Sequence, residues 1–196
     1  MTNLAFALAA TIKHDGHGGV ADLLSTPEQA SAWLAAQSAD LGRFLPPSRA
    51  ENLPNPDEML RELVRMRRAV RALFARAVAP GAPSKADADQ LMGVDEALTV
   101  VNAAAARLGT AELVWDEEPS SRWAYATEDP VNLLGGAVGR SVIEFMVGPD
   151  RQRLRACPAA RCVKYFLQDD PRQTWCSPTC GNRERVNRHY RKRTGG

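Results

Sequence analysis

Cysteine is scarce in this sequence of 196 residues, and long apolar runs are missing from it. There are four cysteines in all. The longest apolar stretch near the start, residues 4–12, is far too short to cross a bilayer. It also lacks the preceding basic residues of a secretory signal, so we interpret it as packed interior. These absences argue against a membrane partner and predict a cytoplasmic protein.

Motifs of the common enzyme classes are missing as well. Residues 1–150 contain no serine, histidine and aspartate arranged as in a catalytic triad. They also contain no helical metal-ligand motif and no phosphate-binding loop. The glycines Gly135, Gly136 and Gly139 superficially resemble such a loop, but no expected strand precedes them and no Lys-Ser/Thr pair follows. We expect them to allow close helix packing instead. The sequence therefore predicts a protein that is not an enzyme and has no catalytic residues.

The composition is that of a globular protein with an uneven distribution of charge. Hydrophobic residues make up 44% and charged residues 24%, which excludes wholesale disorder. Residues 151–196 carry twelve Lys and Arg against three acidic residues, a net charge of +9, whereas residues 1–150 carry −7. A run of charge alone usually marks a solvated surface. Here it coincides with the cysteines, which favours a nucleic-acid partner for this segment.

The cysteines form two close pairs, Cys157 with Cys162 and Cys176 with Cys180. Thirteen residues separate the pairs, enough for a hairpin that brings the second turn to the first. Two thiolates from each tight turn are the ligands that tetrahedral zinc needs, and four close the coordination shell. We therefore predict one structural zinc ion per chain. The alternatives are two disulfides, which a reducing compartment disfavours, or an iron–sulfur cluster, whose common ferredoxin spacings differ from this one.

The module around these cysteines has few apolar residues. Residues 154–156 and 163–167 are expected to pair as a hairpin that turns at the first cysteine pair, and residues 177–193 are expected to form a final helix. Tyr165 and Phe166 are too little apolar material to fold about forty residues without a metal. Zinc should therefore supply most of the folding free energy of a treble-clef-like module.

The expected final helix carries much of the basic charge. We expect Val186 and Tyr190, at i and i+4, to face inward. The other faces fit a helix laid on a phosphate backbone or in a major groove. His189 is expected at the surface, because the cysteines already fill the metal shell. The predicted DNA-contacting residues are Arg183, Arg185, Asn187, Arg188, Arg191 and Lys192.

Residues 1–150 are predicted to be mainly α-helical with one small β-hairpin. Thr26 and Pro27 are typical of a helix start. Residues 14–19 are expected to form an exposed loop, with a metal site at its two histidines as the alternative. The expected helices cover residues 57–79, 84–108 and 130–147, and the expected hairpin covers residues 111–126. The arginines expected at the surface or in ion pairs are Arg61, Arg65, Arg68 and Arg71.

Two segments resemble known families. Residues 151–196 resemble the CGNR zinc finger, which is named for the run that begins at Cys180 and ends at Arg183. Residues 1–150 resemble the ABATE domain, which precedes this finger in bacterial proteins described as stress-induced transcription regulators. The positions that support the second resemblance are Thr11, Leu24, Pro27, Trp33 and residues 61–73. The resemblance implies that the finger binds DNA.

We therefore predict a protein of two parts, a mainly helical body (residues 1–150) and a zinc finger (residues 151–196). The finger is expected to contact double-stranded DNA in a transcriptional regulator. The body is expected to form a homodimer, sense a small molecule, or both. The alternative is a zinc module that binds RNA or an acidic protein partner.

Overall fold

The computed structural model describes residues 3–15, 19–46, 55–87 and 91–194. The helices are α1 (Leu4–Ala9), α2 (Pro27–Ala36), α3 (Ser38–Leu41), α5 (Pro56–Ala77), α6 (Val94–Leu108), α7 (Pro130–Val147), α8 (Asp150–Arg153) and α9 (Pro178–Thr194), with a 3-10 turn η1 (Lys85–Asp87). The strands are β1 (Ile12–His14), β2 (Val20–Asp22), β3 (Gly109–Trp115), β4 (Pro119–Tyr125), β5 (Leu154–Ala156) and β6 (Tyr165–Leu167). They pair as three antiparallel hairpins, β1–β2, β3–β4 and β5–β6.

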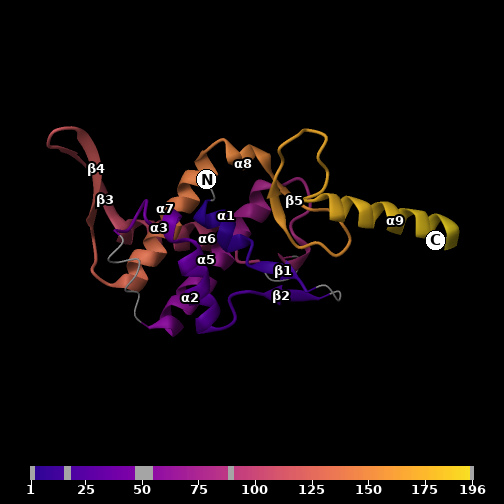
Figure 1. Cartoon of the computed structure of the whole chain (residues 1–196), viewed down its shortest axis with the longest axis horizontal. Coiled ribbons are helices and arrows are strands. Elements are labelled where there is room, and N and C mark those ends of the chain that lie inside the picture. Colours follow the sequence, from indigo (N-terminus) through magenta and orange to yellow (C-terminus); the bar gives the residue numbers. More distant parts are fainter. Residues whose placement is uncertain (1–2, 16–18, 47–54, 88–90, 195–196) are drawn as a thin grey trace.

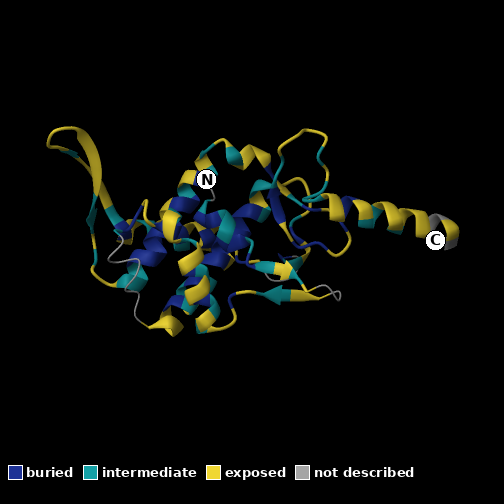
Figure 2. Cartoon of the chain, viewed as in Figure 1, coloured by how far each residue is buried: buried dark blue, intermediate teal, exposed yellow. Residues whose placement is uncertain are grey.

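The molecule is elongated. The helices of the body lie at its centre, the β3–β4 hairpin projects from one end, and α9 extends from the opposite end (Figure 1). Buried residues gather where α1, α5, α6 and α7 meet, whereas the tip of the β3–β4 hairpin and most of α9 are exposed (Figure 2). The predicted class, mainly helical with a small zinc module, is confirmed. In the described part of the chain, no helix has the length and apolar character that a membrane span requires.

Helix α5 is the central element of the body and packs against α1, α2, α6 and α7. Its start has a local cause: the Asn55 side chain accepts a hydrogen bond from the Glu58 N–H (3.4 Å), and Pro56 occupies the first helical position. The helix predicted over residues 57–79 is thus confirmed. The start predicted at Thr26 is confirmed too, since its side chain accepts from the Gln29 N–H at the beginning of α2 (3.3 Å).

Close contact between α6 and α7 depends on glycine. A Cβ atom on Gly136 would lie 2.8 Å from the Cβ of Leu108, and one on Gly139 would lie 2.9 Å from the carbonyl oxygen of Val101. Real Cβ atoms do not approach neighbours so closely, so a larger residue would push the helices apart. The packing role predicted for these glycines is confirmed, and α7 has the predicted bounds.

One predicted helix of the body starts later than expected. The helix expected from residue 84 begins at Val94, because Ser84 and Asp87 use their side chains to bind other parts of the chain, as described below. The loop expected over residues 14–19 connects two short strands: His14 ends β1, β2 begins at Val20, and Asp15 and Gly19 are exposed and lie in neither strand. His17 lies outside the described residues.

The arginines of α5 divide into two groups. Arg61 and Arg65 pair with acidic residues one turn earlier, as predicted, and Arg68 is exposed. Arg71 instead faces the interior, where its side chain is only 5% exposed. Arg67, on the same buried side, donates two hydrogen bonds to the carboxylate of Asp22, at 2.5 and 2.6 Å. Burial alone would raise the pKa of Asp22, but the hydrogen bonds from Arg67 and the Leu24 N–H outweigh it and hold this pKa below its usual range.

The first hairpin of the finger shares the core of the body. Leu154 is fully buried, and the Tyr165 ring meets the Phe74 ring edge-on at a centroid distance of 5.5 Å. Tyr165 therefore packs on the body and adds nothing to a separate core of the finger, contrary to the sequence prediction. The division at residue 150 stays a prediction, but apolar packing crosses it.

Candidate functional site

The first cysteine pair lies on the turn of the β5–β6 hairpin. Ala156 pairs with Tyr165 in the register of the hairpin, and the next residue, Cys157, donates its N–H to the Lys164 carbonyl (2.9 Å). Within the turn, the Cys162 N–H donates to the Ala159 carbonyl (2.9 Å). Both thiols of the first pair therefore come from one tight turn, as the sequence predicted.

The second pair lies at the start of α9. Cys176 precedes the helix, and Cys180 is in its first turn. The Ser177 side chain accepts from the Cys180 N–H (3.3 Å), and the Ser177 carbonyl accepts from the Gly181 N–H (3.2 Å). The positive end of the helix dipole therefore lies beside these two sulfurs.

The four sulfurs form one cluster, all within 4.8 Å of one another. The Cys162 and Cys176 Sγ atoms are 3.7 Å apart, and those of Cys176 and Cys180 are 3.6 Å apart. A tetrahedral zinc site with Zn–S bonds of about 2.3 Å requires sulfurs about 3.8 Å apart. The cysteines are free thiols, with separations far beyond the length of a disulfide bond. The residues therefore fit a zinc ion with four cysteine ligands.

The electrostatics of the cluster suit a bound cation. Hydrogen bonds from the Cys162 and Cys176 thiols lower the pKa of Cys157. Its thiolate, held by the same hydrogen bonds, then raises the pKa of Cys162 and of Cys176. Four adjacent thiolates repel one another in the absence of a positive charge. A divalent metal supplies that charge, and its binding is coupled to deprotonation of the thiols.

Side chains around the cluster connect its two halves. Glu184 of α9 accepts a hydrogen bond from the Ala160 N–H on the first turn (2.7 Å). The Arg183 guanidinium lies 3.4 Å from the Cys180 sulfur and is half-buried. The structure places Arg183 beside a metal ligand, and its predicted contact with DNA stays a prediction. There its charge compensates that of the thiolates.

The body also contacts the first cysteine turn. The Lys85 ammonium donates to three successive backbone carbonyls, those of Cys157 (3.4 Å), Pro158 (3.2 Å) and Ala159 (3.0 Å). A carbonyl triplet of this kind binds a cation well because all three dipoles point at it. Lys85 therefore holds the metal-binding turn against the body.

The other predicted DNA-contacting residues follow the exposed part of α9. Arg185 and Arg188 are exposed, and Arg185 also bonds to the Asn182 side chain. Asn187 is half-buried and donates to Glu184 (3.4 Å). The side chains of two further predicted residues, Arg191 and Lys192, lie outside the described residues. The structure therefore leaves Arg185 and Arg188 as the clearest basic surface of the helix.

The prediction that Val186 and Tyr190 face inward is wrong. They are 67% and 69% exposed. Helical spacing indicates which residues share a face, but a face is buried only where another element covers it. Helix α9 extends away from the rest of the molecule (Figure 1), and the face that carries this pair is exposed.

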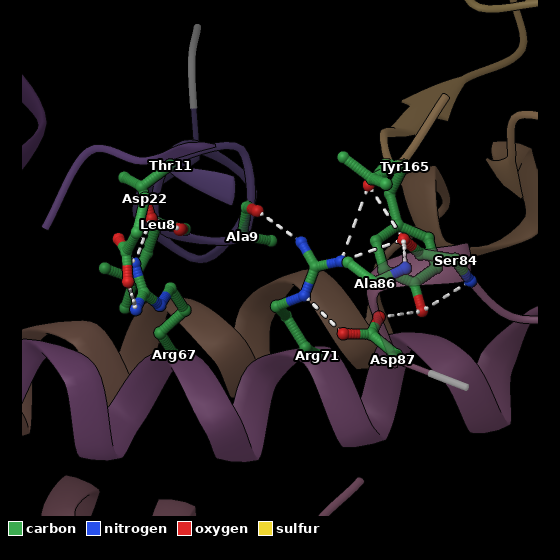
Figure 3. Close-up of polar contacts among 11 residues, drawn as sticks. Leu8, Ala9, Thr11, Asp22, Arg67, Arg71, Ser84, Ala86, Asp87 and Tyr165 are labelled. Atoms are coloured by element: carbon green, nitrogen blue, oxygen red, sulfur yellow. Dashed lines mark hydrogen bonds and ion pairs between the residues drawn. The ribbon is translucent and has the colours of Figure 1, made fainter. Parts of the chain in front are cut away.

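A buried polar network that the sequence reasoning missed joins the body to the finger (Figure 3). Arg71 of α5 donates to the Asp87 carboxylate (2.6 Å), the Ser84 hydroxyl (2.9 Å) and the Ala9 carbonyl (2.7 Å). From the finger, Tyr165 donates its hydroxyl to Asp87 (2.8 Å). Burial, reinforced by the Asp87 charge, raises the pKa of Tyr165 and keeps its proton in place.

The same network includes a backbone group of the finger. The Val163 carbonyl accepts from Ser84 (2.8 Å) and from Arg71 (3.4 Å). A signal for the network was present in the sequence: Arg67 and Arg71 are at i and i+4 on the same side of the helix as the buried Leu63 and Phe74. Their partners could not be identified, because they are 13 to 92 residues away.

Comparisons with known proteins agree with this geometry. Residues 2–149 match the model of the ABATE family, described as "Putative stress-induced transcription regulator". Residues 153–193 match the model of the CGNR zinc finger. No curated protein matches the chain. The four-cysteine cluster is therefore the site of one structural zinc ion, as predicted from the spacing.

Proposed function

The chain belongs to the ABATE family, and from this premise we propose that it is a transcription regulator that binds double-stranded DNA through α9 of its zinc finger. The observation that carries the proposal is an exposed basic helix that starts at the zinc site, with Cys176 just before the helix and Cys180 in its first turn. Zinc fixes that turn, so the direction of the helix is set by the metal site. The finger, with a charge of +9, would approach DNA first, because the body carries −7.

The proposed contacts follow from the exposed side chains. Arg185 and Arg188 would neutralise phosphates, and such contacts position a protein on the duplex without reading its sequence. Val186, exposed between them, offers an apolar contact of the kind that distinguishes the methyl group of thymine. Arg183 would act indirectly, by holding Cys180 and the start of the helix.

We propose a binding role for the body rather than a catalytic one. Homodimer formation is supported by the projecting β3–β4 hairpin, whose Leu113 and Trp115 side chains are 75% and 69% exposed. Large apolar side chains in this setting are typical of surfaces that another chain covers. A dimer would double the phosphate contacts and so strengthen DNA binding through high effective concentration.

The proposal predicts the salt dependence of DNA binding. Each phosphate contact contributes about −0.9 to the slope of log affinity against log salt concentration. The double substitution Arg185→Ala with Arg188→Ala should therefore make the slope less negative by about 1.8 per protomer and weaken binding at low salt. The measurement is fluorescence anisotropy of a labelled random duplex at several salt concentrations.

The matched control removes two exposed arginines from the body. Arg61→Ala with Arg122→Ala changes the net charge equally and should leave the slope unchanged. If the α9 variant and the control have the same slope as the unmodified protein, DNA binds elsewhere or not at all. Tighter binding of single-stranded RNA than of duplex would favour the alternative function.

A further inference from the structure

A cavity of about 280 Å³ lies beside the buried polar network, between the β1–β2 hairpin, α5 and η1. Its apolar walls include Ile12, Val20, Val64 and Leu91. Its polar lining comes from three arginines of α5 and from Asp87. Ligand sites are typically concave, mostly apolar and equipped with a few convergent polar groups, and this cavity is at the small end of their range.

The three arginines differ in what they already bind. Arg67 is occupied by Asp22 and Thr11, and Arg71 is occupied by Asp87, Ser84 and two backbone carbonyls. Arg68 is exposed and has no hydrogen bond or ion pair within the described part of the chain. The cavity therefore combines apolar walls with one guanidinium that is available to a ligand.

That combination selects a chemical class. A guanidinium binds a carboxylate through two parallel hydrogen bonds, and the apolar walls favour a hydrocarbon group attached to it. A volume of about 280 Å³ suits a small molecule better than a nucleotide or a peptide. We propose that this cavity is the effector site of the body, that it binds a small monocarboxylate with an apolar tail through Arg68, and that binding acts on the finger.

The route to the finger is short. Ala86 and Asp87 line the cavity, and Asp87 also accepts the Tyr165 hydroxyl of β6 (2.8 Å). The neighbouring residue, Lys85, holds the carbonyls of the first cysteine turn. A ligand in the cavity would therefore touch Ala86 and Asp87, which directly follow the residue that holds the metal-binding turn. The proposal rests on the proposed sensing role of the body, and it assigns that role a site and a ligand class.

The binding step is tested on the zinc-loaded full chain with hexanoate and benzoate, and with hexanamide and benzamide as neutral analogues. Calorimetry and thermal unfolding should show that at least one acid binds and its amide does not. Arg68→Gln should raise the Kd for that acid at least about tenfold, as expected for loss of a charged hydrogen-bonding pair. The control Arg61→Gln, on the same helix outside the cavity, should retain binding.

The proposed site is contradicted if neither acid binds, if an amide binds as tightly as its acid, or if Arg68→Gln binds like the unmodified protein. The link to the finger is tested without DNA, by the rate at which zinc is transferred to a coloured chelator. The acid should change this rate, and Tyr165→Phe, which removes one bond of the network, should reduce the change. An unaltered rate in the presence of bound acid would overturn the link.

These measurements separate two kinds of failure. If the protein binds no DNA, the proposed function fails, whereas acid binding and zinc transfer still report on the cavity. If DNA binds but no acid does, the cavity proposal fails alone. Where both occur, the acid must change DNA affinity, and DNA must change acid affinity by the same factor.

Discussion

Replacing Arg71 with methionine is expected to lower the free energy of unfolding by about 3–5 kcal/mol. The Arg71 and Asp87 side chains are 5% and 7% exposed, so the substitution would leave a carboxylate buried without its main partner. The carbonyls of Ala9 and Val163 would each lose a hydrogen bond as well. Methionine keeps the unbranched stem of arginine as far as the Nε position, so the loss is mainly one of the guanidinium charge and its hydrogen bonds. Urea unfolding followed by circular dichroism measures the change.

Two further variants test whether the loss of stability comes from the buried charge. Arg65→Met removes the ion pair between Arg65 and Glu62, which are three residues apart on the same helix. The Arg65 side chain is 37% exposed, so the substitution should lower the free energy of unfolding by at most about 1 kcal/mol. Adding Asp87→Asn to Arg71→Met should recover part of the loss, because the buried charge is then gone. If Arg71→Met lowered the free energy of unfolding by less than about 1 kcal/mol, water would have to reach the network, and the network would contribute little to stability.

Replacing Cys176 with serine is expected to release zinc and unfold α9. Structural zinc sites contribute apparent binding free energies of about 10–16 kcal/mol in isolated fingers, which is more than such a small module can replace by packing. The body should remain helical. The β5–β6 hairpin should stay docked on it, because Leu154 and Tyr165 are buried in the core of the body.

Elemental analysis measures the metal, and hydrogen exchange of the α9 amides measures the unfolding. Ser177→Ala is the matched control: it removes the side chain that accepts from the Cys180 N–H, costs about 1 kcal/mol, and should keep the zinc. If the Cys176→Ser protein retained one zinc ion with unchanged exchange in α9, this sulfur would not be a necessary ligand. If the β5–β6 amides exchanged as fast as those of α9, the hairpin would depend on zinc rather than on the body.

The features that could be predicted from the sequence are those that depend on residues close together in the chain. Helix α7 and the cysteine cluster follow from patterns within a few turns of chain, namely apolar spacing and paired thiols. The late start of α6 could not be foreseen, because Ser84 and Asp87 leave the helix to bind Arg71 and Tyr165. Those bonds form only after distant segments meet.

The errors on α9 have a similar cause. The pattern correctly placed Val186 and Tyr190 on one face, but whether that face is covered depends on the position of the helix relative to the body. The contact of Arg183 with the metal site, by contrast, is a local feature that the sequence analysis did not consider. Its position one turn after Cys180 was visible in the sequence, and that spacing places it beside the sulfur. A basic residue one turn after a ligand is therefore better predicted as a partner of the metal site.

Zinc-dependent DNA binding is tested most directly by titrating one labelled duplex with three states of the same full chain. These are the zinc-loaded protein, the protein stripped by a chelator, and the stripped protein reloaded with one equivalent of zinc. At about 50 mM salt, stripping should weaken binding at least about tenfold, because α9 loses its fixed start, and reloading should restore it. Equal affinity in the loaded and stripped states would contradict DNA binding by a zinc-ordered finger.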